Sequence, residues 1–366
     1  MADVGEWDAL GERVRRTRLA VGLSQVDLAK LVGLDRTMIA KIEAGTRRVD
    51  ALELTRLSAA LRVPLDYLLR PLPQVLSRRA GVLNEEADSA ASRESSRLEI
   101  VLASWLRDVQ QLVELGTLRP RPLLTSEHPV DSSESAREAA LGLRERLGYG
   151  VAPIGALVEL CEKAGQFVLV TDAPGEGASL VDDGIAAAVV SLHGDPGRRR
   201  ATAAHELGHL VVGDEYSSDL GVHAARADRE AAIDAFAAEL LIPTQVLTKA
   251  GGGTSGVSRG QLVELAARYR TSWTLALRQA DHAGVLDPRA RNVLARSSPT
   301  KSEFMEALGW VPQPDLESIR VPPGYAHAVI EAWRRGAITP SRAVELMHGQ
   351  LNLADLPVEP EADDTP

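Results

Sequence analysis

The sequence predicts a mainly α-helical protein with a small α+β core in the middle of the chain. An all-α domain is expected at the N-terminus and a helical extension at the C-terminus. Two observations carry this prediction. Apolar residues recur at helical spacing through most of the 366 residues, and only two short runs, 167–170 and 185–192, are of the β type. Alanine, leucine and arginine, which favour helices, are frequent.

Stretches rich in proline, glycine or small polar residues, at 71–73, 117–135 and 251–253, divide the chain. Residues 84–97 are polar with few apolar anchors, and we interpret them as a linker or a solvated helix. Five regions follow: an all-α domain at 1–72, a helical connector at 73–134, an α+β domain at 135–250, a helical subdomain at 251–353 and an acidic, disordered tail at 354–366.

Composition excludes several classes of protein. A formal net charge of -10 argues against a protein that coats nucleic acid along its whole length, although a local basic surface remains compatible with it. The acidic N-terminus is unlike a signal peptide, and no apolar run approaches the roughly 20 residues that span a bilayer. We therefore expect a cytoplasmic protein without membrane contacts. Cys161, the one cysteine, cannot form an internal disulfide, and its apolar helical context predicts a small buried hydrophobe.

Residues 23–45 have the pattern of two short helices joined by a tight turn. Ser24 and Asp35 stand where each helix would begin, and both residue types cap helix N-termini. Gly33 lies between the helices, where a left-handed backbone permits a sharp turn. Ile39 and Ile42 supply the inner face of the second helix.

The outer face of this second helix keeps polar donors, as a helix that reads base edges and meets phosphates needs. Residues 8–70 closely resemble the Xre/Cro-type helix-turn-helix family. The resemblance implies that the protein binds double-stranded DNA, with Arg47 and Arg48 near the DNA backbone. The implied contacts are Gln25, Arg36, Thr37, Lys41 and Arg47. The alternative is a domain of this shape used only for protein contacts.

His205-Glu206-Leu207-Gly208-His209 fits the H-E-x-x-H pattern of zinc-dependent hydrolases. Two histidines four residues apart share one face of a helix, so both imidazoles can bind one zinc ion. Glu206 lies beside them and can polarise a water molecule as the catalytic base. The alternative is a pair of histidines on a helix surface.

A catalytic zinc site needs a third protein ligand. Glu230 and Asp234 are four residues apart on a later helix and share one face. The arrangement resembles thermolysin-like zinc proteases, which implies Glu230 as the third ligand and Asp234 as the group that orients a ligating histidine. Glu239 and His223 are the alternatives for the third ligand.

Residues 135–285 look like the ImmA/IrrE metallopeptidase family, through the segment from Arg200 to His209 and the later Phe236-Ala237-Ala238-Glu239-Leu240-Leu241-Ile242-Pro243. One departure is Ile233, where the family often has alanine. The resemblance implies a zinc-dependent endopeptidase that cleaves a partner repressor, often itself a helix-turn-helix protein, and so relieves repression.

Two alternative functions are compatible with the sequence. The metallopeptidase-like domain could sense a metal, a ligand or a partner without turnover, because the fused DNA-binding domain already suits a transcription factor. The other is a toxin–antitoxin or mobile-element regulator whose substrate is encoded next to it. Homodimerisation is compatible with each reading. Tyr216 and the arginines that precede it are candidates for holding the oxyanion during hydrolysis.

Overall fold

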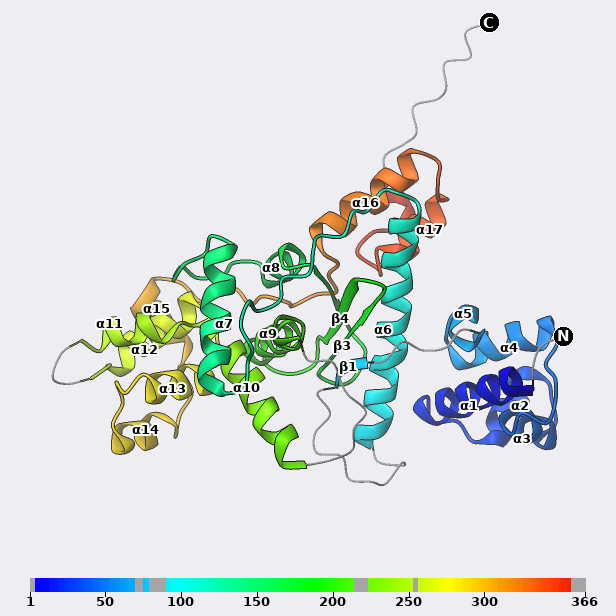
Figure 1. Cartoon of the computed structure of the whole chain (residues 1–366), viewed down its shortest axis with the longest axis horizontal. Coiled ribbons are helices and arrows are strands. Elements are labelled where there is room, and N and C mark those ends of the chain that lie inside the picture. Colours follow the sequence, from blue (N-terminus) through cyan, green and yellow to red (C-terminus); the bar gives the residue numbers. More distant parts are fainter. Residues whose placement is uncertain (1–3, 70–74, 79–89, 214–222, 253–255, 357–366) are drawn as a thin grey trace, which may run out of the picture.

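The computed structural model describes residues 4–69, 75–78, 90–213, 223–252 and 256–356. The described chain is mainly α-helical and contains one small four-stranded sheet near its middle, which confirms the predicted fold class (Figure 1). Most of the expected acidic tail lies outside the described residues. Within them, no single helix is long and apolar enough to cross a membrane, and one bent pair of helices, Ala227–Leu241 with Thr244–Ala250, meets that criterion by length and composition only.

The N-terminal region has the predicted helix-turn-helix. Ser24 Oγ accepts a hydrogen bond from the backbone N–H of Asp27, and Gly33 ends that helix with a φ of 73°, as expected. Asp35 occupies the N-cap position of the next helix, as predicted, but within the described residues its side chain makes no capping hydrogen bond. The helices are α1 (Val4–Ala20), α2 (Gln25–Val32), α3 (Arg36–Glu43), α4 (Ala51–Leu61) and α5 (Leu65–Leu69).

Helix α6 (Ala90–Glu114) connects the N-terminal helices to the sheet and lies between them (Figure 1). It begins inside the stretch expected as a linker or a solvated helix. Ile100 and Ala103 on this helix belong to the core of the N-terminal helices. Leu102 and Trp105 belong to a second core under the sheet. One helix therefore contributes apolar side chains to two cores.

The strands run in the order β1-β3-β4-β2. The central strand β4 (Ile185–Ser191) pairs in parallel with β2 (Gln166–Thr171) and antiparallel with β3 (Gly177–Asp182). Strand β1 (Val75–Arg78) pairs antiparallel with the other edge of β3. Strands β2 and β4 correspond to the two predicted β-type runs, whereas β1 and β3 have no counterpart among the predictions.

Both faces of the sheet are covered. In β4, Ala186, Ala188 and Val190 belong to the core shared with α9 (Pro196–Val212). The alternating residues Ala187 and Val189 belong to the core shared with α6. Because both faces are buried, β4 is apolar at almost every position instead of alternating with polar residues.

Helix α9 packs against α10 (His223–Leu241), which in turn packs against α7 (Ser133–Arg146). The close approach of α9 and α10 depends on Gly208. A Cβ at that position would lie 3.0 Å from Ile233 Cγ2 and 3.0 Å from Phe236 Cδ1. Ile233, the departure from the family pattern, is fully buried at this contact. The short helix α8 (Leu157–Lys163) leads into β2 and buries Cys161, as predicted.

The remaining helices divide between two cores. One group has a core of its own and consists of α11 (Thr244–Ala250), α12 (Arg259–Arg268), α13 (Trp273–His282) and α14 (Pro288–Leu294), with α15 (Lys301–Leu308) against α12. The other returns to the α6 side of the sheet and consists of α16 (Pro323–Arg334), α17 (Pro340–Leu346) and the 3-10 turn η1 (Leu353–Asp355).

Candidate functional site

Helix α9 begins at a well-formed cap and continues into the core. Asp195 Oδ1 accepts hydrogen bonds from the backbone N–H groups of Gly197 (2.9 Å) and Arg198 (3.2 Å), and Pro196 takes the first position of the helix. From Thr202 to Val211 every residue of the helix is buried. The two histidines of the motif are therefore core residues, and the alternative of two surface histidines is wrong.

His205, His209 and Glu230 converge. The Nε2 atoms of His205 and His209 are 3.1 Å apart, and Glu230 Oε2 lies 3.3 Å from His205 Nε2. One ligand atom from each of the three residues lies within 4.8 Å of the others. Two ligands at the roughly 2.0–2.1 Å that zinc prefers are about 3.3 Å apart in a tetrahedral arrangement. Two imidazoles and one carboxylate at these separations fit a zinc ion.

Asp234, one turn after Glu230, contacts the other side of the first histidine. Its Oδ1 lies 3.0 Å from His205 Nδ1. A carboxylate at Nδ1 fixes the orientation and tautomer of the ring and leaves Nε2 to face the cluster. The four-residue spacing predicted that Glu230 and Asp234 share a face, and α10 turns that face to α9.

Glu206 is fully buried and faces the sheet. Ser179 Oγ on β3 donates a 2.7 Å hydrogen bond to Glu206 Oε2. Among the residues that the structure describes, Glu206 Oε1 has no hydrogen-bond partner. A buried acceptor without a partner costs about 1–3 kcal/mol, so such an atom usually marks a place where another group binds. One carboxylate oxygen is thus fixed by the protein, and the other is available for chemistry.

The sequence did not indicate two residues that hydrogen-bond to Glu206. Ser179 lies on β3, a strand without a clear signal in the sequence, and Gln166 Nε2 donates to the main-chain oxygen of Glu206 at 3.0 Å. Gly177 also matters, because a Cβ there would lie 2.5 Å from Thr202 Cγ2 and 3.0 Å from Glu206 Oε1. The run of small residues that opens β3 was the available signal.

Glu239, one of the two alternatives for the third ligand, has other partners. Glu239 Oε2 accepts hydrogen bonds from Arg137 Nη1 and Gln279 Nε2, each at 3.0 Å. Its Oε1 accepts from the backbone N–H of Thr244 at 2.9 Å. Glu239 therefore belongs to a buried network that joins α7, α10 and α13. The side chain of His223 and the whole of Tyr216 lie outside the described residues.

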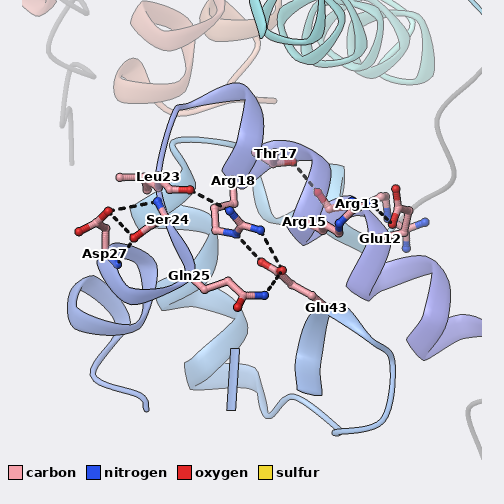
Figure 2. A network of polar contacts seen from close by, with 10 residues as sticks. All are labelled: Glu12, Arg13, Arg15, Thr17, Arg18, Leu23, Ser24, Gln25, Asp27 and Glu43. Carbon is pink, nitrogen blue, oxygen red and sulfur yellow. Dashed lines mark hydrogen bonds and ion pairs between the residues drawn. The ribbon is translucent and has the colours of Figure 1, made fainter. Parts of the chain in front are cut away.

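The predicted DNA-contacting residues fall into two groups. Arg36, Thr37 and Lys41 are exposed on α3. Gln25 and Arg47 are half-buried and already bonded within the protein. Gln25 Nε2 donates to Glu43 Oε2 at 2.9 Å (Figure 2). Both terminal nitrogens of Arg47 donate to Glu53, at 2.6 and 2.9 Å, and this pairing raises the pKa of Arg47.

Comparisons with known proteins cover both regions. The Helix-turn-helix family matches residues 14–68, and the family described as IrrE N-terminal-like domain matches residues 161–279. An uncharacterized transcriptional regulator in the ATPase CF(0) region of Rhodospirillum rubrum is 37% identical over 73 residues, which are 20% of this chain and 68% of that protein.

Two further proteins are similar over a short segment. An uncharacterized HTH-type transcriptional regulator of Sinorhizobium medicae is 36% identical over 64 residues, 18% of this chain and 46% of that protein, so the chain spans less than half of that relative's length. Among solved structures, the restriction-modification controller protein C.AhdI from Aeromonas hydrophila shares 38% identity over 18% of this chain and 97% of its own, with a TM-score of 0.17.

Proposed function

The chain belongs to the helix-turn-helix transcriptional regulators and carries an IrrE N-terminal-like domain, and from this premise we propose that it is a DNA-binding regulator with a working zinc-dependent endopeptidase site. Its substrate in this proposal is a partner repressor protein, whose cleavage relieves repression. The observation that carries the proposal is the convergence of His205, His209 and Glu230 within 4.8 Å, next to the buried carboxylate of Glu206.

The donor set supports zinc as the metal. His205, His209 and Glu230 would hold the ion, and two histidines with one glutamate are a common set in catalytic zinc sites, which keep one position open. A zinc ion bound there would supply Lewis acidity. Asp234 keeps the His205 ring in its ligating orientation through the 3.0 Å contact at Nδ1.

Glu206 would move the protons of the hydrolysis. Its Oε1, which lacks a hydrogen-bond partner among the described residues, takes a proton from the attacking water and later returns it to the leaving amine. Ser179 holds Oε2 throughout and so keeps the carboxylate aimed at the site. Glu206 is not a metal ligand in this geometry, so acid–base catalysis is the simplest role for its carboxylate.

On the DNA side, the exposed face of α3 would read the major groove. Arg36 and Thr37 lie in the first turn of α3, where recognition helices contact base edges, and Lys41 lies one turn later. The side chain of Gln25 already donates a hydrogen bond to Glu43, and that of Arg47 donates to Glu53. Either residue would have to contact DNA while it keeps this bond within the protein. We therefore assign base reading to the first turn of α3.

The competing function is a sensor without turnover. The position of α6 favours it, because one helix packs against the helix-turn-helix core and against the sheet that supports the site. Metal or ligand binding could then act on DNA binding through α6. The two functions differ in what they require of Glu206, since a sensor needs the metal ligands and hydrolysis needs the base as well.

The test compares Glu206→Gln with His205→Ala in a reporter strain. Glu206→Gln keeps the size of the side chain but removes the base, a role worth typically 100- to 10,000-fold in rate. We expect this variant to retain zinc and DNA binding, to leave the partner repressor full length on immunoblots and to fail to relieve repression. If Glu206→Gln regulates like wild type while His205→Ala does not, the sensor is the correct function.

A further inference from the structure

Strand β3 forms one wall of the candidate site. Ser179 on β3 donates to Glu206, and Gly177 lies so close to α9 that a Cβ would collide with Thr202. The inner edge of β3 pairs with β4. The outer edge is therefore the place where an extended polypeptide could pair with the strand that holds the carboxylate of Glu206.

That outer edge is already paired. Val75–Arg78 runs antiparallel along it as β1, with Val75 opposite Leu180, Ser77 opposite Ser179 and Arg78 opposite Ala178. Strand β1 also lies against α9, the helix that carries both histidines. The segment that pairs with Ser179 therefore lies beside the residue that holds the Glu206 carboxylate. It comes from the part of the chain between α5 and α6 (Figure 1).

An unpaired strand edge binds extended peptides through main-chain hydrogen bonds, a mode known as strand addition. We propose that Val75–Arg78 inhibits this site in cis, because it occupies the outer edge of β3 on which an extended peptide substrate would pair. This inference rests on the proposed peptidase function. A protein substrate must then displace β1 before its backbone reaches Glu206, so the chain inhibits its own site.

The pairing between β1 and β3 has the features of one that a competing strand can displace. Strand β1 has four residues, and its register shifts between Val75 and Ser77. A short strand with an irregular register makes few ladder bonds, so its pairing with β3 is weak by itself. The covalent connection of β1 to α5 and α6 offsets this weakness, because a tethered segment has an effective concentration on the order of millimolar at the edge of β3. Release of β1 leaves α6 in place, because Trp105 Nε1 on that helix donates to the main-chain oxygen of Phe167 on β2.

The experiment measures occupancy of the edge directly. The full chain carries Glu206→Gln so that no peptide is cut, and a fluorescein-labelled peptide of residues 72–81 is titrated while its anisotropy is followed. Adding Ser77→Pro to the chain removes a backbone N–H from β1 and should free the edge. We expect the peptide to bind this variant at least about tenfold more tightly than the parent, because the tethered competitor is gone.

Ser77→Ala is the matched control, since it keeps the backbone N–H, and it should bind the peptide as the parent does. A peptide that itself carries the proline should not bind any of the proteins. Equal binding to the parent and to Ser77→Pro overturns the proposal, because the edge is then open already. Absence of binding to both overturns it as well, because the edge then accepts no peptide.

A second variant guards against misfolding caused by proline. Replacing Val75–Arg78 by Gly-Ser-Gly-Ser lowers strand propensity without a steric clash, and it should bind the peptide as Ser77→Pro does. Far-UV circular dichroism checks that both variants keep the helix content of the parent. Peptide binding does not require hydrolysis, so a failure of the reporter test above and a failure of this proposal give separate results.

Discussion

Two clusters of buried and half-buried polar side chains show how structural and chemical roles differ in this molecule. In the helix-turn-helix domain, Arg18 Nε and Nη2 donate to the two carboxylate oxygens of Glu43 at 2.6 and 3.0 Å, and the Gln25 amide donates to the same carboxylate (Figure 2). Between α9 and α10, by contrast, two imidazole nitrogens and a carboxylate oxygen converge. The first cluster matches donors with acceptors and neutralises its own charge. The second gathers metal-ligating atoms, and such a set is complete when it binds a cation.

The largest effect on stability should come from breaking the first cluster, that of Arg18, Glu43 and Gln25. Arg18→Met keeps most of the side-chain volume but leaves the buried Glu43 carboxylate without its cation. Removing one partner of a buried ion pair typically costs about 3–5 kcal/mol, and we expect a loss of this size in urea unfolding followed by circular dichroism. Glu206→Gln, in the other cluster, should change stability by less than about 1 kcal/mol. Equal losses in the two variants would contradict the distinction between the clusters.

The next effect separates two glutamates on the same helix. Glu230→Ala should weaken zinc retention by at least about 100-fold, since loss of a ligand should exceed the 10- to 100-fold cost of losing a group that supports one. Glu239→Ala should retain zinc but destabilise the fold by about 1.5–3 kcal/mol, because Arg137, Gln279 and Thr244 lose a buried acceptor. Metal content of the purified proteins and urea unfolding measure both. Zinc loss in Glu239→Ala alone would show that the wrong glutamate has been assigned.

A smaller effect should appear on the DNA side, where the proposed contact residues are exposed. Arg36→Ala with Thr37→Ala should reduce discrimination between operator and unrelated duplex, by about 1–3 kcal/mol for each base contact. Lys41→Ala should weaken binding to all sequences and flatten the dependence on salt. Titrations of labelled duplexes at several salt concentrations measure both. If the double variant binds like wild type, the domain serves protein contacts.

The smallest effect concerns Cys161, which packs in the core beside the site. Burial raises the pKa of its thiol from 9.0 to about 12. Because the folded pKa lies above the unfolded value, the reactive thiolate is suppressed in the native state up to about pH 12. We expect no labelling by a thiol reagent at about pH 8 in the native protein and complete labelling in denaturant. Rapid native labelling would indicate that α8 opens locally.

The sequence predicted the features that depend on local spacing. The four-residue intervals between His205 and His209, and between Glu230 and Asp234, place each pair on one helix face whatever the rest of the fold does. The sequence could not predict the partners that come from a distant strand. Ser179 meets Glu206 only because β3 pairs with β4 and begins with residues small enough for α9 to approach.

The same limit applies to the strands and to the network residues. Strand β1 is a four-residue segment whose pairing with β3 joins parts of the chain about 100 residues apart, and no local signal encodes such a pairing. Glu239 lies nine residues from Glu230 on α10, and the sequence pattern could not show that its carboxylate turns to Arg137 and Gln279. Which face of α10 meets α9 is decided by close packing at Gly208.

Helix α6 also determines which fragments of the protein can fold by themselves. Ile100 and Ala103 close the underside of the helix-turn-helix core, Arg97 Nε donates to the main-chain oxygen of Ala20, and Arg16 pairs with Glu99. A fragment that stops at residue 75 loses all of these contacts and exposes apolar surface to water. A DNA-binding fragment should therefore extend through Glu114. Since the other face of α6 is buried against the sheet, heating the whole chain should melt the helix-turn-helix domain and the sheet domain in one calorimetric transition.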